Sequence, residues 1–114
     1  MEISVSQIKE VVVLSLSGKI MGGPDGTLMN DKLHELLDEE KKFVVIDLKE
    51  VSLMNSSGLG MLIGGLTTMR NNGGNLKLAC VTNKIESLMT ITKLNKLFES
   101  YGTVDEAVRS FDFS

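Results

Sequence analysis

The sequence has few of the residues that build catalytic or metal centres. Its 114 residues include one histidine, one cysteine and no tryptophan. Cys80 cannot form an internal disulfide and falls in an apolar strand pattern, so we expect a buried thiol. His34 lies beside the apolar stripe of a predicted helix, where we expect a solvated side chain. Because no set of His, Cys, Asp and Glu has the spacing of metal ligands, we predict neither a metal nor a cofactor.

Long apolar runs and basic clusters are also missing. The longest uncharged apolar stretch, around residues 59–66, is interrupted by glycines and is shorter than the ~20 residues that span a bilayer. Residues 1–8 lack the basic start and apolar run of a signal peptide. A net charge of −3 without a Lys/Arg cluster argues against nucleic acid as the main partner. We therefore expect a cytoplasmic protein that does not insert into a membrane.

The apolar residues follow the periods of alternating strands and helices. Strands are predicted at residues 3–16 (a hairpin), 43–48, 76–80 and 97–101. Helices are predicted from the approach at Pro24 to about Glu40, from near Ser57 to Gly73, from Asn83 and from Thr103. The order ββαβαβαβα predicts an α/β fold, a mixed, mostly parallel sheet of about four to five strands packed with about four helices. The chain length suits one domain over residues 1–114.

Local signals predict some details of the helices. Asn83 and Thr103 each precede a glutamate by three residues, so each is expected to cap its helix by accepting a backbone N–H. Gly60 and Gly64 lie one turn apart, which could let their helix approach a neighbour closely.

The segment from Met54 to Gly60 is the predicted functional centre. Ser56 and Ser57 lie where a buried strand leads into a helix, so backbone N–H groups and the positive end of the helix dipole face their hydroxyls. Phosphorylation would add about −1.5 to −2 charges that the helix N-terminus can stabilise but a docked partner would oppose. Either serine could instead be only the helix N-cap, and the residues alone leave both interpretations open.

Two kinds of catalytic or nucleotide site fit poorly. The nucleophile turn of an acyl hydrolase needs Gly-x-Ser-x-Gly and a later histidine, whereas these serines follow Met54-Asn55 and His34 comes earlier. The spacing of Gly58, Gly60 and Gly64 differs from that of a dinucleotide-binding turn, and no acidic residue ends the next strand.

The same segment carries a family resemblance. Val44–Leu48 followed by Val51–Gly60 resembles the signature of the STAS domain, specifically the bacterial anti-sigma factor antagonists. The likeness extends over nearly the whole chain, through the hairpin ending at Leu16–Gly18, the Gly73-Gly74 turn, Ile91–Phe98 and Val104–Ala107.

The resemblance implies a non-enzymatic partner switch. The unphosphorylated protein would bind an anti-sigma factor that is also a serine kinase, phosphorylation would end the binding, and a PP2C-type phosphatase would restore it. The family's phosphoacceptor is the serine before Gly-Leu-Gly, here Ser57. The implied partner-binding residues are Lys19, Met21, Asp25, Asn55, Ser56, Ser57, Gly58, Leu59, Gly60 and Met61.

Three positions depart from the family pattern. Asn55 replaces the usual aspartate, and Lys19 and Met21 replace acidic residues of the preceding loop; Asp25 is close enough in sequence to replace part of the missing charge. These departures keep open an alternative, a STAS module of another system that does not need Ser57 phosphorylation. Such a module could be a stressosome-like scaffold or a cytosolic accessory subunit of a lipid transporter.

Overall fold

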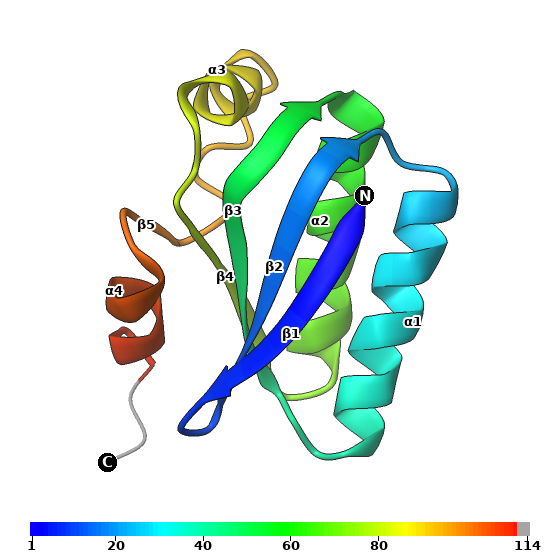
Figure 1. The fold of residues 1–114 in the computed structure, drawn as a ribbon, viewed down its shortest axis with the longest axis vertical. Helices are drawn as coiled ribbons and strands as arrows, with labels where there is room; N and C mark the ends of the chain where they lie inside the picture. Colours follow the sequence, from blue (N-terminus) through cyan, green and yellow to red (C-terminus); the bar gives the residue numbers. More distant parts are fainter. Residues whose placement is uncertain (112–114) are drawn as a thin grey trace.

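A five-stranded sheet with helices on both faces forms the body of the protein in a computed structural model, which describes residues 1–111 (Figure 1). The strands are β1 (Glu2–Ile8), β2 (Val11–Ile20), β3 (Phe43–Met54), β4 (Asn75–Ala79) and β5 (Ser100–Tyr101). The helices are α1 (Pro24–Asp38), α2 (Ser56–Asn71), α3 (Asn83–Ile91) and α4 (Val104–Arg109). The sheet order is β1-β2-β3-β4-β5, with β1 antiparallel to β2 and the other pairs parallel. The predicted α/β class and element order are confirmed, whereas the single domain over 1–114 stays a prediction whose last three residues lie outside those described.

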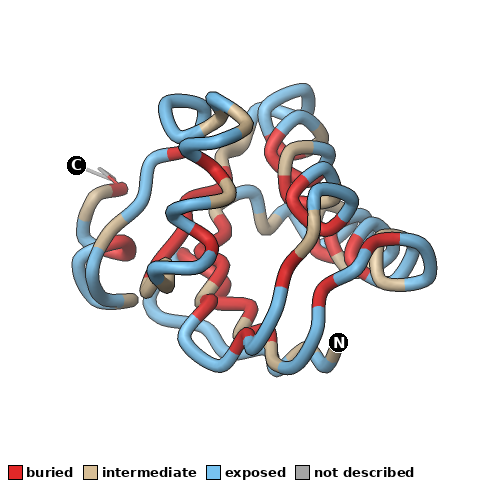
Figure 2. Tube along the Cα trace, turned by 90° about the horizontal axis from the view of Figure 1, so that it is seen from above, coloured by how far each residue is buried: buried red, intermediate tan, exposed pale blue. Residues whose placement is uncertain are grey.

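The central strands are buried on both faces because helices cover each side. Val44 and Ile46 of β3 belong to the larger core, shared with α1, α2 and α3, whereas Val45 belongs to a smaller core shared with α4. Buried residues accordingly line the middle of the molecule in Figure 2. Burial of nearly continuous apolar strands is the pattern expected of parallel sheets.

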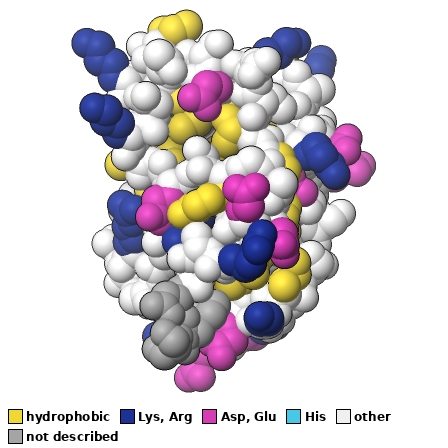
Figure 3. Space-filling view, turned by 90° about the vertical axis from the view of Figure 1, so that its left-hand side faces the viewer, with side chains coloured by type: hydrophobic (Ala, Val, Ile, Leu, Met, Phe, Trp, Pro, Cys, Tyr) yellow, Lys and Arg dark blue, Asp and Glu magenta, His cyan; other side chains and the backbone are white. Residues whose placement is uncertain are grey.

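A buried lysine fixes α4 to the sheet. The Lys77 side chain of β4 is 7% exposed, and its ammonium group donates to the Ser110 hydroxyl at 2.9 Å. The same nitrogen lies 4.3 Å from the ring centre of Phe111 and 3.4 Å from a carboxylate oxygen of Glu99. Charge-assisted hydrogen bonds and a cation–π contact thus compensate the burial of the charge. On the side of the molecule that carries α4, acidic and basic side chains are interspersed (Figure 3).

The strand β3 is longer than predicted. It continues from the apolar run through Val51 to Met54, pairing with a β2 that also extends to Ile20. The pairing register shifts between Ser15 and Ser17 and again between Gly18 and Lys19. These irregularities break the alternation of apolar residues, which is why the sequence pattern ended the strand too early.

Two local predictions were wrong. The N-cap of α3 is Thr82, whose hydroxyl accepts the Ile85 N–H, and not Asn83; the cap at Thr103 is confirmed by its bond from the Glu106 N–H at 3.1 Å. A Cβ added at Gly60 or Gly64 would meet no atom within 4 Å, so neither glycine permits a close approach. The close contacts of α2 are made instead by Gly58 and by Gly65, whose added Cβ would lie 3.0 Å from a methyl of Leu33 on α1.

Cys80 is only half-buried, in contrast to the expected buried thiol. It lies one residue beyond β4 in a left-handed conformation, with φ of 57°. Burial of the thiol and the nearby Asp47 carboxylate raise its pKa above the ordinary value of 9.0. The exposed His34 side chain agrees with the expected solvated position.

The longest helix is α2, with 16 residues. Within residues 1–111, no helix combines the length and the apolar character needed to cross a membrane.

Candidate functional site

The start of α2 is capped by an amide side chain. Asn55 has an extended backbone, and its side-chain oxygen accepts the Gly58 N–H at 2.8 Å. Ser56 and Ser57 are the first two residues of the helix. The alternative in which one of the serines is the N-cap is therefore wrong.

Both serines are exposed, whereas the residues that follow them are not. Gly58 is buried and Leu59 is 1% exposed, because both lie on the stripe of α2 that faces the core. These two predicted partner-binding residues therefore lie beneath the surface that carries the serines. Gly60 is exposed and Met61 is partly buried, so both remain available at the surface.

The loop between β2 and α1 packs against the serine that the family resemblance selects. Gly22 has φ of +82°, and a Cβ added there would lie 2.7 Å from the Ser57 Cβ. A Cβ added at Gly58 would overlap the carbonyl oxygen of Ile20, which also accepts the Asn55 N–H at 3.4 Å. The end of β2, the loop and the start of α2 thus form one close-packed unit in which two glycines allow the backbone contacts.

Sequence reasoning did not include Gly22 in the site. The signal was present, since two consecutive glycines before Pro24 are typical of a loop with positive φ that ends at the first turn of a helix. Pro24 is indeed the first residue of α1. The contact with Ser57 depends on two elements far apart in the chain and has no local pattern.

Asp25 holds this loop in place. Its carboxylate accepts the Met21 N–H at 3.3 Å and lies 3.7 Å from the amino group of Met1. Within residues 1–111 its carboxylate makes no hydrogen bond to residues 55–57. The described contacts therefore do not support the expectation that Asp25 takes the place of the family's aspartate at position 55. The carboxylate contributes to the site through the shape of the loop.

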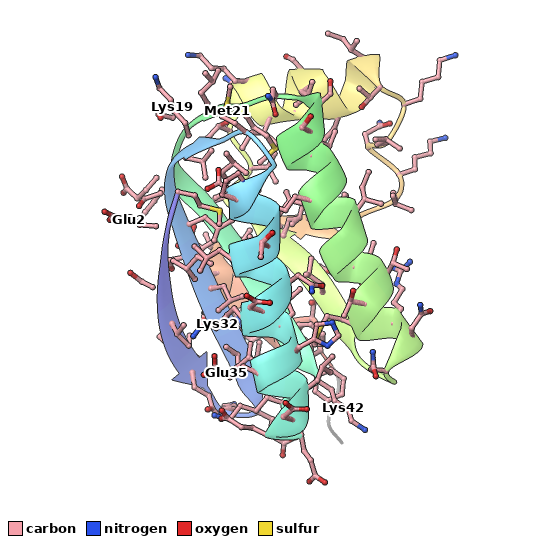
Figure 4. The ribbon with its side chains drawn as sticks, turned by 90° about the vertical axis from the view of Figure 1, so that its right-hand side faces the viewer. Glu2, Lys19, Met21, Lys32, Glu35 and Lys42 are labelled. Atoms are coloured by element: carbon pink, nitrogen blue, oxygen red, sulfur yellow. The ribbon has the colours of Figure 1, made fainter. Side chains whose placement is uncertain are left out.

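Exposed apolar and basic side chains lie at the same end of the molecule as the start of α2. Lys19 and Met21 are exposed at the end of the molecule where α1 and α2 begin (Figure 4). Leu53, the partner of Lys19 in the β2–β3 pairing, is 42% exposed and was not among the predicted residues. We include these exposed side chains, with Ser57, in the candidate interaction surface.

A groove of about 210 Å³ runs between α1 and α2 beside this surface. Met29 of α1 and Met61 of α2 line the groove. Gly26 and Gly64 also line it, and they have no side chains to fill it. Methionine side chains can adapt to partners of different shape.

The electrostatics of the helix start favour an added anion. The first turn of α2 contains no acidic residue, and Asn55 caps it without a charge. A phosphate on Ser57 would therefore lie at the positive end of the helix dipole, which stabilises an anion by about 0.3–1 kcal/mol. No carboxylate in the first turn would repel it.

Known proteins share this sequence pattern and this fold. The sequence matches the STAS domain family over residues 2–107. It is similar to the anti-sigma-B factor antagonist of Bacillus subtilis, with 29% identity over 97 residues that cover 85% of this chain and 87% of the relative.

Two solved structures are also similar. One is the crystal structure of an anti-sigma factor antagonist from Mycobacterium paratuberculosis, with a TM-score of 0.80, 23% identity and coverage of 96% of this chain and 92% of that one. The other is the Bacillus cell fate determinant SpoIIAA in the phosphorylated form, with a TM-score of 0.71, 17% identity and coverage of 96% and 98%. At these identities the two structures establish a shared fold.

Proposed function

Because this chain belongs to the STAS domain family, we propose that it is an anti-sigma factor antagonist that is switched by phosphorylation of Ser57. The observation that carries the proposal is the position of Ser57, exposed in the first turn of α2 and packed against Gly22 of the neighbouring loop. The name of the Bacillus subtilis relative, an anti-sigma factor antagonist, supports the same function.

In the unmodified protein, the surface around Ser57 binds the anti-sigma factor. Exposed Lys19, Met21 and Leu53 and the partly buried Met61 supply apolar area and one positive charge. Asp25 and Asn55 keep the loop and the helix start in one shape, so little conformational entropy is lost on binding.

Phosphorylation ends this binding by a local change of charge. The phosphate adds about −1.5 to −2 charges beside Gly22, in the middle of the docking surface. A partner that covers the surface must then desolvate the phosphate or place it against its own groups, at a cost that can exceed 2 kcal/mol. The helix dipole stabilises the free phosphorylated protein, so the fold survives the modification.

The remaining parts of the switch follow from the family resemblance. The anti-sigma factor is itself the serine kinase that modifies Ser57, and a PP2C-type phosphatase removes the phosphate. The antagonist is a cytoplasmic protein and has no enzymatic activity of its own.

The test is intact-mass analysis after incubation with Mg-ATP and each candidate anti-sigma kinase of the same genome. We expect a gain of one phosphate, ~80 Da, that is abolished in Ser57→Ala. Ser56→Ala is the matched control, because Ser56 is the adjacent exposed serine in the same turn. Modification that persists in Ser57→Ala would move the switch to another residue.

Binding is measured on the same samples by calorimetry. We expect the phosphorylated protein to bind the anti-sigma factor at least ~30-fold more weakly than the unmodified protein, the equivalent of about 2 kcal/mol. Binding to a partner that never phosphorylates Ser57 under these conditions would contradict the switch and favour a scaffold or transporter module. Binding to none of the candidates would contradict the antagonist function itself.

A further inference from the structure

Asp25 makes two bonds to the loop segment that packs against Ser57. Its carboxylate accepts the Met21 N–H at 3.3 Å, and its own N–H donates to the Gly22 carbonyl oxygen at 3.2 Å. The first bond holds the residue before Gly22, and the second holds Gly22 itself. The loop lies at the end of the molecule where α1 and α2 begin, and Met21 is its first residue after β2 (Figure 4).

Little else fixes the shape of this loop. Gly22 and Gly23 have φ of +82° and +60°, and glycine loses more conformational freedom on folding than any other residue. Gly23 is the N-cap of α1 and offers no side-chain cap. Within residues 1–111, the Asp25 carboxylate is the only side-chain group that hydrogen-bonds to residues 21–23. Loss of this carboxylate should therefore leave the loop free to move away from α2.

The loop contacts Ser57 through its backbone at Gly22. A Cβ added at Gly22 would have the Cβ, the carbonyl carbon and the carbonyl oxygen of Ser57 as its three nearest atoms, at 2.7, 3.2 and 3.3 Å. None of these atoms belongs to Ser56, although both serines are exposed in the first turn of α2. The contact therefore limits the positions of the Ser57 side chain and does not restrain Ser56.

We infer that Asp25 is a positioning residue for the modification of Ser57. By keeping Gly22 against Ser57, it fixes that hydroxyl, and not the hydroxyl of Ser56, for attack on ATP bound to the kinase. Among the described residues, the Asp25 carboxylate makes no hydrogen bond to residues 55–57, so it acts through the loop. The inference rests on the phosphorylation of Ser57 proposed above and names the residue that selects this serine.

The transfer depends on the position of the attacking oxygen. The Ser57 Oγ forms a bond to the γ-phosphorus of ATP while the bond from that phosphorus to the bridging oxygen breaks, so ADP leaves and the hydroxyl proton passes to a base of the kinase. The kinase supplies the ATP and the base, and this chain supplies the position of the oxygen. Because a displacement of about 1 Å at a reacting group can cost ~100-fold in rate, a loop that no longer packs against Ser57 should slow the transfer.

Two substitutions of Asp25 test its bond to Met21, with Mg-ATP and the anti-sigma kinase that modifies the wild type. Asp25→Ala removes the acceptor, and we expect kcat for phosphorylation of Ser57 to fall at least ~10-fold while KM changes less than ~3-fold. Asp25→Asn keeps an oxygen that can accept the Met21 N–H, so it should recover most of the loss. Asp31→Ala is the matched control, because Asp31 is exposed on the same helix and the change in charge is the same.

Urea unfolding verifies that the three variants fold, and three results would overturn the inference. A change in KM alone would make Asp25 a contact of the kinase. Asp25→Asn as slow as Asp25→Ala would make the charge, rather than the hydrogen bond, the cause. Equal losses in Asp25→Ala and Asp31→Ala would leave no special role for the loop.

The site of modification is a second readout, which a general loss of stability would not change. Tandem mass spectrometry of the phosphorylated protein gives the ratio of phosphate on Ser56 to phosphate on Ser57. We expect this ratio to rise at least ~10-fold in Asp25→Ala and to stay near the wild-type value in Asp25→Asn, since only the Ser57 hydroxyl loses its support. An unchanged ratio in Asp25→Ala would overturn the selection of Ser57 by the loop.

A double variant tests whether Asp25 acts through Gly22. If it does, Gly22→Ala and Asp25→Ala disturb the same contact, so the double variant should be only as slow as the slower single variant. Losses that multiply would overturn this link. The wild type separates the inference from the proposed function: a wild type that no candidate kinase modifies would overturn both, whereas equal rates for the wild type and Asp25→Ala would overturn the positioning role alone.

Discussion

The side-chain oxygen of Asn55 accepts the backbone N–H of Gly58 at 2.8 Å, so an amide caps the helix that carries Ser57. Asn55→Ala removes this cap, and we expect the free energy of unfolding to fall by about 1 kcal/mol. Asn55→Asp keeps an acceptor and adds a charge that the helix dipole stabilises by about 0.3–1 kcal/mol. Urea unfolding should therefore rank Asn55→Asp at or above the wild type and Asn55→Ala below it. Equal stability of wild type and Asn55→Ala would contradict the capping role.

Gly58 and Gly60 lie on the same helix two residues apart but in opposite environments. A Cβ at Gly58 would overlap the Ile20 carbonyl oxygen, so we expect Gly58→Ala to lower the free energy of unfolding by about 1–3 kcal/mol or more. A Cβ at Gly60 meets open space, so Gly60→Ala should raise stability by up to about 1 kcal/mol through helix propensity. Urea unfolding of the pair measures both effects. A destabilising Gly60→Ala would mean that Gly60 is closely packed after all.

Sequence patterns predicted the elements that depend on local periodicity. The apolar run at Phe43–Leu48 and the buried stripe of α2 could be recognised because burial on a sheet or a helix face imposes a period. The same reasoning missed the second half of β3, where shifts in the pairing with β2 remove that period. It also chose Asn83 over Thr82, although both are good capping residues, because the choice depends on where the chain leaves β4.

The site was predicted less completely than the fold. The serines and Asn55 could be located because a strand leads directly into a helix there. The contacts of Gly22 with Ser57 and of Gly58 with Ile20 join segments more than 30 residues apart. Such contacts depend on the packing of whole elements and leave no spacing pattern in the chain, so only the structure reveals them.

Gly22 is expected to control access to Ser57. Gly22→Ala places a methyl 2.7 Å from the Ser57 Cβ, so the loop must move away from the helix. We expect the initial rate of Ser57 phosphorylation by the anti-sigma kinase to fall at least ~10-fold, since small displacements of a reacting group are costly. Gly23→Ala is the control, because Gly23 also has positive φ but its added Cβ meets no atom within 4 Å. Equal losses in the two variants would attribute the effect to backbone strain rather than to contact with Ser57.

The Asp47 carboxylate and burial both keep the Cys80 thiol neutral. Burial is the larger cause of the raised pKa, and the negative charge of Asp47 and its hydrogen bond from the thiol add to it. Because the folded-state pKa lies above the ordinary 9.0, the thiol's contribution to stability is fully present below about pH 9 and is lost as the pH rises through the folded-state pKa.

The rate at which iodoacetamide alkylates the folded protein, measured against pH, gives the pKa of the Cys80 thiol, since only the thiolate reacts. We expect Asp47→Asn to move the midpoint of this profile to lower pH, though not below the value for the unfolded chain, whereas Glu50→Gln on the exposed part of the same strand should leave it in place. An unchanged midpoint in Asp47→Asn would assign the raised pKa to burial alone.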